Sequence, residues 1–84
     1  MPSVNLRYFA SLREQLGTAE ERTDLPPQVT TIGQLRDWLA DECGHHALKD
    51  THNLRCALNQ KLDTFDATVN EGDEVAFFPP LTGG

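Results

Sequence analysis

The sequence predicts an α+β fold, in which one amphipathic helix packs against one face of a mixed β-sheet. Residues 4–9 and 74–78 show the side-chain alternation of β-strands with one buried face. Between residues 32 and 43, apolar side chains instead recur at helical spacing. One helix of this length covers only one face of a sheet, so the other face is expected to contact water.

The alternation assigns each strand residue to a face of the sheet. Phe9 and Phe78 fall on the outer face, away from the helix. Exposed aromatic side chains on a small domain commonly mark a protein interface, so this pair is expected to form an apolar patch unless a loop covers it. The residues expected to face the helix are Val4, Leu6, Tyr8, Val75 and Phe77.

Two capping-box patterns predict where the helices begin. The S-x-x-E pattern of residues 11–14 opens a short helix, and Gly17 ends it. The T-x-x-Q pattern of residues 31–34 opens the main helix, and Gly44 ends it as a left-handed cap. The other segments are expected to be an edge strand at 20–25, a loop at 45–53, a strand at 54–58, a turn at 59–60 and an extended piece at 61–62.

The chain has 84 residues, which predicts a single domain over residues 1–84. Its net charge of −6 argues against a nucleic-acid partner, because phosphate must be neutralised by Lys and Arg. No apolar run approaches the length of a membrane span, and the amino end lacks the basic and apolar regions of a signal peptide. A cytoplasmic protein without membrane association is therefore expected.

Two cysteines and three histidines lie between residues 43 and 56, and their spacing matches none of the usual paired-ligand patterns. No metal site is therefore expected. Both thiols are expected to be buried or half-buried, because Cys43 and Cys56 fall on apolar faces. Cys43 lies at the carboxyl end of a helix, which does not favour a thiolate nucleophile. The histidines are His45, His46 and His52.

The carboxyl end of the chain, residues 77–84, reads F-F-P-P-L-T-G-G. Pro79 and Pro80 cannot continue a helix or a central strand, so an extended tail is expected over residues 79–84. Gly83 and Gly84 lack a Cβ atom, which allows them to enter a narrow channel. A stiff base with a bare tip is suited to insertion into the pocket of another protein.

Three segments resemble the small subunit of molybdopterin synthase, a family of ubiquitin-like sulfur carriers. These segments are residues 8–17, 57–62 and 70–84, and the F-F-P-P run joined to G-G is the most diagnostic part. The resemblance implies a β-grasp fold and a chain that catalyses nothing by itself. The chain has no glycine-rich phosphate loop, so ATP must be bound by a partner, and no cofactor is expected on the chain itself.

The same resemblance implies a chemical role for the carboxyl terminus. An activating enzyme adenylates the Gly84 carboxylate with ATP, and the adenylate is converted to a thiocarboxylate. The tail, ending in Gly83 and Gly84, then enters the large subunit of a heterotetrameric synthase, where its sulfur passes to a pyranopterin precursor of the molybdenum cofactor. Arg13 matches a family position, but it is equally consistent with a charged side chain on the solvent-exposed face of the short helix that has no role in binding. The residues implied to contact the partner are Phe9, Arg13, Leu62, Phe78, Pro79, Pro80, Leu81 and Thr82.

Other functions fit the same tail. A sulfur carrier for thiazole synthesis or tRNA thiolation would have the same fold and the same terminal glycines, although the F-F-P-P run favours molybdopterin synthase. A ubiquitin-like modifier would instead transfer the Gly84 acyl group to a lysine. A plain interaction module would have an inert tail. The fate of the Gly84 carboxyl group therefore separates these functions.

Overall fold

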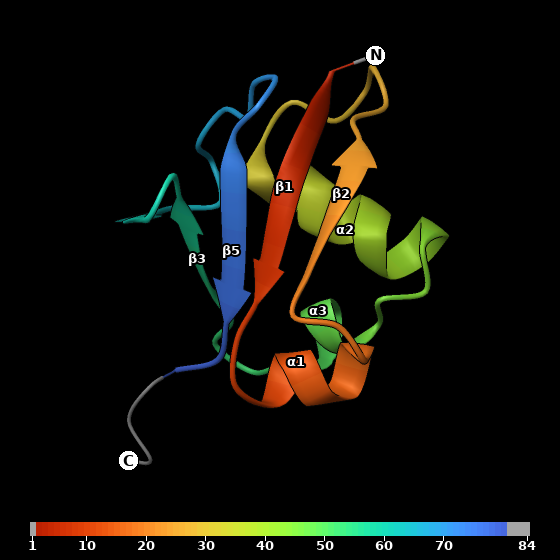
Figure 1. Cartoon of the computed structure of the whole chain (residues 1–84), viewed down its shortest axis with the longest axis vertical. Coiled ribbons are helices and arrows are strands. Elements are labelled where there is room, and N and C mark those ends of the chain that lie inside the picture. Colours follow the sequence, from red (N-terminus) through yellow and green to blue (C-terminus); the bar gives the residue numbers. More distant parts are fainter. Residues whose placement is uncertain (1, 81–84) are drawn as a thin grey trace.

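Five strands form one mixed sheet in the computed structural model, which describes residues 2–80 (Figure 1). Their order across the sheet is β2-β1-β5-β3-β4. The first and last strands of the chain lie side by side and run parallel, whereas every other neighbouring pair is antiparallel. The strands are β1 (Ser3–Tyr8), β2 (Glu20–Asp24), β3 (Arg55–Leu58), β4 (Lys61–Asp63) and β5 (Glu74–Phe78).

Three helices accompany the sheet: α1 (Ser11–Leu16), α2 (Ile32–Glu42) and α3 (Ala47–Asp50). Figure 1 shows α2 crossing behind β1 and β2, so that the sheet has one covered face and one open face. This arrangement confirms the predicted α+β class, and a single helix held across a mixed sheet is the ubiquitin-like β-grasp arrangement. None of the helices described is long and apolar enough to cross a membrane.

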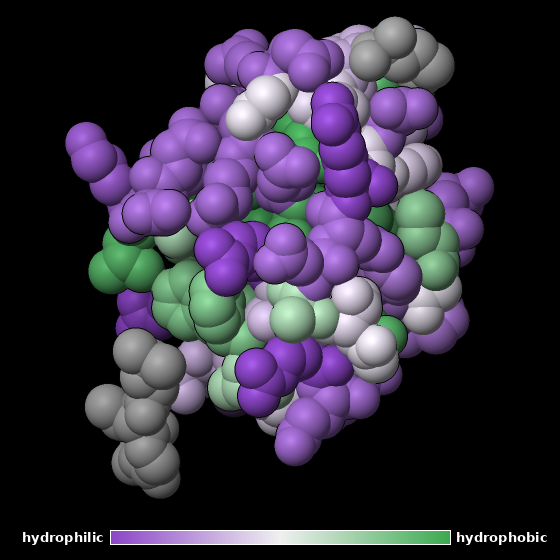
Figure 2. Space-filling view, in the orientation of Figure 1, coloured by the Kyte–Doolittle hydropathy of each residue, from purple (hydrophilic) through white to green (hydrophobic). Residues whose placement is uncertain are grey.

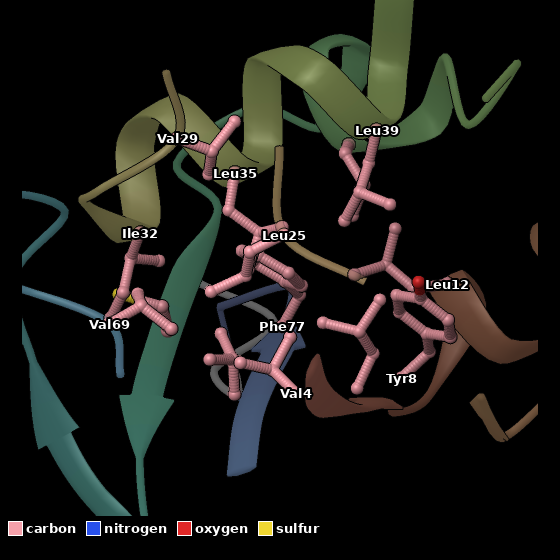
Figure 3. Close-up of a cluster of buried hydrophobic side chains, with 14 residues drawn as sticks. Val4, Tyr8, Leu12, Leu25, Val29, Ile32, Leu35, Leu39, Val69 and Phe77 are labelled. Atoms are coloured by element: carbon pink, nitrogen blue, oxygen red, sulfur yellow. The ribbon is translucent and has the colours of Figure 1, made fainter. Parts of the chain in front are cut away.

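The hydrophobic core lies between α2 and the sheet. Figure 3 shows Ile32, Leu35 and Leu39 of α2 pointing toward the side chains of the strands. Tyr8 and Phe77 stack there, with their ring centroids 6.4 Å apart and an interplanar angle of 15°. The five residues predicted to face the helix are all buried, which confirms the assignment of faces: Val4, Leu6, Tyr8, Val75 and Phe77.

The main helix begins with the predicted capping box. The Thr31 hydroxyl accepts a hydrogen bond from the Gln34 N–H at 3.2 Å, and the Gln34 side chain accepts one from the Thr31 N–H. At the other end, Gly44 adopts a φ of +78°, the left-handed conformation predicted for it. Asn59 and Gln60 also have positive φ, which forms the predicted tight turn between β3 and β4.

Two local predictions are wrong. Ser11 does not cap α1: it is the first residue of the helix, after Ala10 with a φ of 55°, and no side chain caps this end. The segment predicted as a loop at 45–53 contains α3, because the Leu48 side chain is buried in the core and draws one helical turn against it. The Thr51 N–H closes this turn by donating to the Ala47 carbonyl at 2.9 Å.

Replacing Thr31 with Ala tests the cap of α2. The substitution removes the acceptor of the Gln34 N–H, so we expect the free energy of unfolding to fall by about 1 kcal/mol in urea titrations. Thr31→Ser keeps the hydroxyl and is the matched control. Equal stability of Thr31→Ala and wild type would contradict a stabilising role for this cap.

Candidate docking surface

The open face of the sheet is built in rows, because residues paired across neighbouring strands share a face. In one row, Ala76 of β5 lies between Arg7 of β1 and Ala57 of β3, and Ala57 pairs in turn with Leu62 of β4. Leu62 is 73% exposed, the largest exposure of any large apolar side chain among the described residues. This row therefore ends in an apolar side chain directed toward solvent.

The next row lies at the end of the sheet where β5 finishes. Phe78 pairs with Arg55 of β3 on one side. On its other side lies Phe9, whose N–H donates to the Phe77 carbonyl at 3.2 Å and so extends the pairing beyond β1. Phe9 is 44% exposed, which confirms its predicted outward placement, and Phe78 is half-buried.

Phe9, Leu62 and Phe78 together are called the apolar patch below. Figure 2 shows hydrophobic side chains gathered on this face beside the end of β5. Most of the surrounding surface in this view is hydrophilic. Large apolar side chains exposed together on a small domain are typical of surfaces that bind another protein.

The predicted tail begins directly at the apolar patch. Pro79, half-buried, and Pro80, exposed, follow β5 without a break. Arg13 is exposed on α1, which lies near the end of β5 in Figure 1. The other predicted tail residues lie outside the described residues, so their roles stay predictions: Leu81, Thr82, Gly83 and Gly84.

A polar cluster that the sequence did not predict lies on the opposite, covered face. Tyr8 donates its hydroxyl hydrogen to Glu21 Oε1 at 2.8 Å, and His45 Nε2 lies 2.6 Å from the same oxygen. A carboxylate only accepts hydrogen bonds, so Nε2 carries the hydrogen. This cluster ties β1, the edge strand β2 and the segment after α2 together. Its one sequence signal is the alternation of β2, which places Glu21 inward.

The cluster shifts two pKa values. Burial would raise the pKa of Glu21, but the hydrogen bonds from His45 and Tyr8 outweigh it, and the pKa falls below its ordinary value of 4.5. Burial, and next the hydrogen bond to Glu21, raise the pKa of Tyr8 far above its ordinary range. Glu21 is therefore ionised and Tyr8 neutral at neutral pH, so this donor–acceptor pairing persists.

The two cysteines differ in exposure. Cys56 is buried as predicted, donates to the Asp63 carbonyl at 3.3 Å, and has a pKa raised to about 11 by burial and by Asp63. The prediction is wrong for Cys43, which is exposed, because it lies at the C-cap beyond the last turn packed on the core. Burial of the thiol, then Glu21 and Glu42, raise its pKa, so neither thiol has the lowered pKa of an activated nucleophile.

Metal-ligating side chains do not gather in the part of the chain that the structure describes. No group of three or more His, Cys, Asp or Glu side chains there could hold a metal ion. His45 is engaged with Glu21, whereas His46 and His52 are exposed.

Comparison with known proteins places the chain in a family. A model of the ThiS family matches residues 6–84. The chain belongs to the ThiS family. Two similar relatives are molybdopterin synthase sulfur carrier subunits: that of Escherichia coli K12 is 39% identical and that of Haemophilus influenzae Rd is 37% identical. Each match spans 82 residues, 96% of this chain and 99% of the relative, and confirms the resemblance seen in the sequence.

Solved structures of the same shape include members of several lineages. SAMP1 from Haloferax volcanii is 25% identical with a TM-score of 0.76, over 98% of this chain and 99% of that one. A putative molybdopterin converting factor subunit 1 from Pyrococcus furiosus, 24% identical, has a TM-score of 0.79 over 96% and 100%. A chain of the complex of subunits 1 and 2 of molybdopterin-converting factor from Helicobacter pylori, 22% identical, has a TM-score of 0.64 over 98% of this chain and 99% of that one. The last two show the β-grasp fold alone.

Replacing Glu21 with Gln tests the polar cluster through pH. Because the folded-state pKa of Glu21 is lowered, its ionised form stabilises the fold above pH 4.5, and this contribution is lost as the pH falls through the folded-state value. We expect Glu21→Gln to unfold more easily than wild type at neutral pH, and the difference to shrink on acidification. Urea titrations at several pH values measure it. Glu20→Gln, at the exposed neighbour, is the control, and a difference independent of pH would contradict the assignment.

Proposed function

We propose that this chain is the sulfur carrier subunit of a molybdopterin synthase, with the Gly84 carboxyl group as its only reacting group. Membership of the ThiS family and the names of its relatives support this proposal. The structural observation that carries it is the apolar patch at the end of β5, directly before the tail. A surface that binds a partner at the base of the tail also directs the tail into that partner.

The first chemical step is activation of the Gly84 carboxylate. A carboxylate is a poor acyl donor, so a partner enzyme transfers AMP from ATP to it and releases pyrophosphate. A sulfide-level nucleophile then attacks the acyl carbon, and the bond from this carbon to the AMP oxygen breaks. AMP leaves with the electron pair of that bond, and the product is a thiocarboxylate on Gly84.

The second step is delivery of the sulfur. The large subunit of the synthase covers the apolar patch and admits the tail. The thiocarboxylate sulfur then bonds to a carbon of the pyranopterin precursor and displaces an oxygen substituent, which leaves with the electron pair of its C–O bond. Water then cleaves the acyl–sulfur bond and restores the carboxylate. Pro79 and Pro80 lower the conformational entropy lost on insertion, and the absence of Cβ at Gly83 and Gly84 lets the backbone approach the precursor closely. The chain itself performs no catalysis in this scheme.

A protein modifier is the second candidate function. SAMP1 from Haloferax volcanii, 25% identical over nearly the whole chain, is described as a small archaeal modifier protein, which favours this alternative. The activation step would be the same, but a lysine amine would take the place of sulfide and form an isopeptide bond. Carriers for thiazole synthesis or tRNA thiolation share the thiocarboxylate and differ only in the acceptor.

Intact mass tests the proposed chemistry. We incubate the chain with the adenylating enzyme of its source organism, ATP and a sulfide source, and expect a mass gain equal to replacement of one oxygen by sulfur. A variant that lacks Gly84 ends in Gly83 and should not gain sulfur. Conjugates with other proteins would instead support the modifier. An unchanged mass, with an enzyme that activates another carrier in parallel, would rule out both.

Replacing Phe78 with Asp tests the apolar patch. A carboxylate at this half-buried position cannot be covered by an apolar surface without a large desolvation cost, so we expect affinity for the large synthase subunit to fall at least about 30-fold. Titration calorimetry measures the affinity, and circular dichroism verifies folding. Gln28→Asp, on the exposed segment after β2, adds the same charge away from the patch. If Phe78→Asp binds the large subunit with wild-type affinity, Phe78 is not part of the interface.

A further inference from the structure

Arg55 lies beside the apolar patch and is not explained by the fold. It opens β3 and pairs with Phe78 of β5, so both side chains project from the open face. Arg55 is exposed. The row therefore reads Phe9, Phe78, Arg55, and places Arg55 on β3, between Phe78 of β5 and the edge strand β4 that carries Leu62.

The chain provides Arg55 with no counter-ion among the residues that the structure describes. The ion pairs found there join Arg7 to Glu74, Arg36 to Asp37, His45 to Glu21 and Lys49 to Asp41. Of the 7 basic residues, Arg13, Arg22 and Lys61 also lack an ion pair among the described residues, and Arg55 differs from them in lying directly beside Phe78. The charge of Arg55 is therefore available to a group from outside the chain.

Arg7 provides a comparison on the same face. Its guanidinium lies 4.0 Å from the Glu74 carboxylate and 5.6 Å from the centroid of the Phe9 ring. Intramolecular contacts thus already occupy Arg7, and its stem widens the apolar surface. Arg55 differs because its neighbours in the two rows are apolar: Phe78 beside it and Ala57 two residues along its strand.

Covering the apolar patch would remove water from the Arg55 guanidinium. A charged group that loses its hydration without a partner is costly, whereas a carboxylate can accept two parallel hydrogen bonds from a guanidinium. We infer that the large synthase subunit presents a carboxylate to Arg55 when it covers the apolar patch, so that Arg55 selects a partner with an acidic group at this place. The inference rests on the proposed function and adds the chemistry of the partner surface.

The overall charge of the carrier makes this contact selective. A chain of net charge −6 repels acidic proteins at long range. In the two rows Arg7 lies beside Glu20 of β2 and is ion-paired with Glu74, whereas Arg55 has no acidic neighbour in its row, so the uncompensated positive charge lies on the Arg55 side of this face. An acidic partner is therefore oriented toward this face, and toward its Arg55 side.

The test measures binding of the cognate large synthase subunit to Arg55→Gln. Removing one partner of a desolvated, hydrogen-bonded charge pair acts mainly on the dissociation rate, so we expect dissociation to become at least about 10-fold faster at about 50 mM and at about 500 mM salt alike. Lys49→Gln removes the same charge from α3 and should change the dissociation rate less than about 2-fold. Equal dissociation rates for Arg55→Gln and wild type, or equal increases in both variants, overturn the inference.

Charge reversal identifies the partner group. Arg55→Glu should bind more weakly than Arg55→Gln, and one Asp→Lys or Glu→Lys substitution in the large subunit should restore its affinity; failure of every acidic position to do so overturns the inference. If Arg55→Gln weakens binding to the activating enzyme but not to the large subunit, the inference is also overturned.

The two proposals can fail separately. If wild type binds the large subunit and Phe78→Asp does not, while Arg55→Gln binds like wild type, only the inference about Arg55 fails. Absence of wild-type binding overturns the proposed function as well.

Discussion

The parallel pairing of β1 with β5 determines where the functional surface lies. Parallel strands end at the same edge of a sheet, so the carboxyl ends of these two strands meet although one opens the chain and the other closes it. Phe9, which follows β1, and Phe78, which ends β5, are neighbours for this reason. The tail leaves from the same edge. Apolar patch and tail are thus joined by the topology of the sheet.

One helix on one face gives the sheet its two different surfaces. Side chains that alternate inward from β1 and β5 meet Ile32, Leu35 and Leu39 of α2 and form the core. Side chains that alternate outward have no covering layer within residues 2–80 and are available there for a partner. The pleat of the strands therefore places the core on one face of the sheet and the candidate binding surface on the other.

Much of the fold could be predicted from the sequence because its signals are local. The alternation around Tyr8 and the capping box at Thr31 each act within a few residues, and the structure confirms both. The β2 edge strand and the exposure of Phe9 follow from the same local patterns.

The features that sequence reasoning missed depend on contacts between distant segments. Glu21 meets His45 only because α2 returns the chain to the edge strand, and this pair has no local signature. Leu48 draws α3 against a core assembled by other elements. Cys43 is exposed because the helix ends there, so helical periodicity no longer fixes its direction. Arg55 lies beside Phe78 only because of the register between β3 and β5, which the local sequence does not reveal.

The central position of β5 has a mechanical consequence. This strand is hydrogen-bonded to β1 on one side and to β3 on the other, and its last residue is joined directly to Pro79. A force that pulls the carboxyl terminus acts along the strand, so it loads both ladders in shear and spreads over all their bonds at once. A tail attached to an edge strand would load only one ladder. A pull on the carboxyl terminus of this domain is therefore resisted by two ladders together.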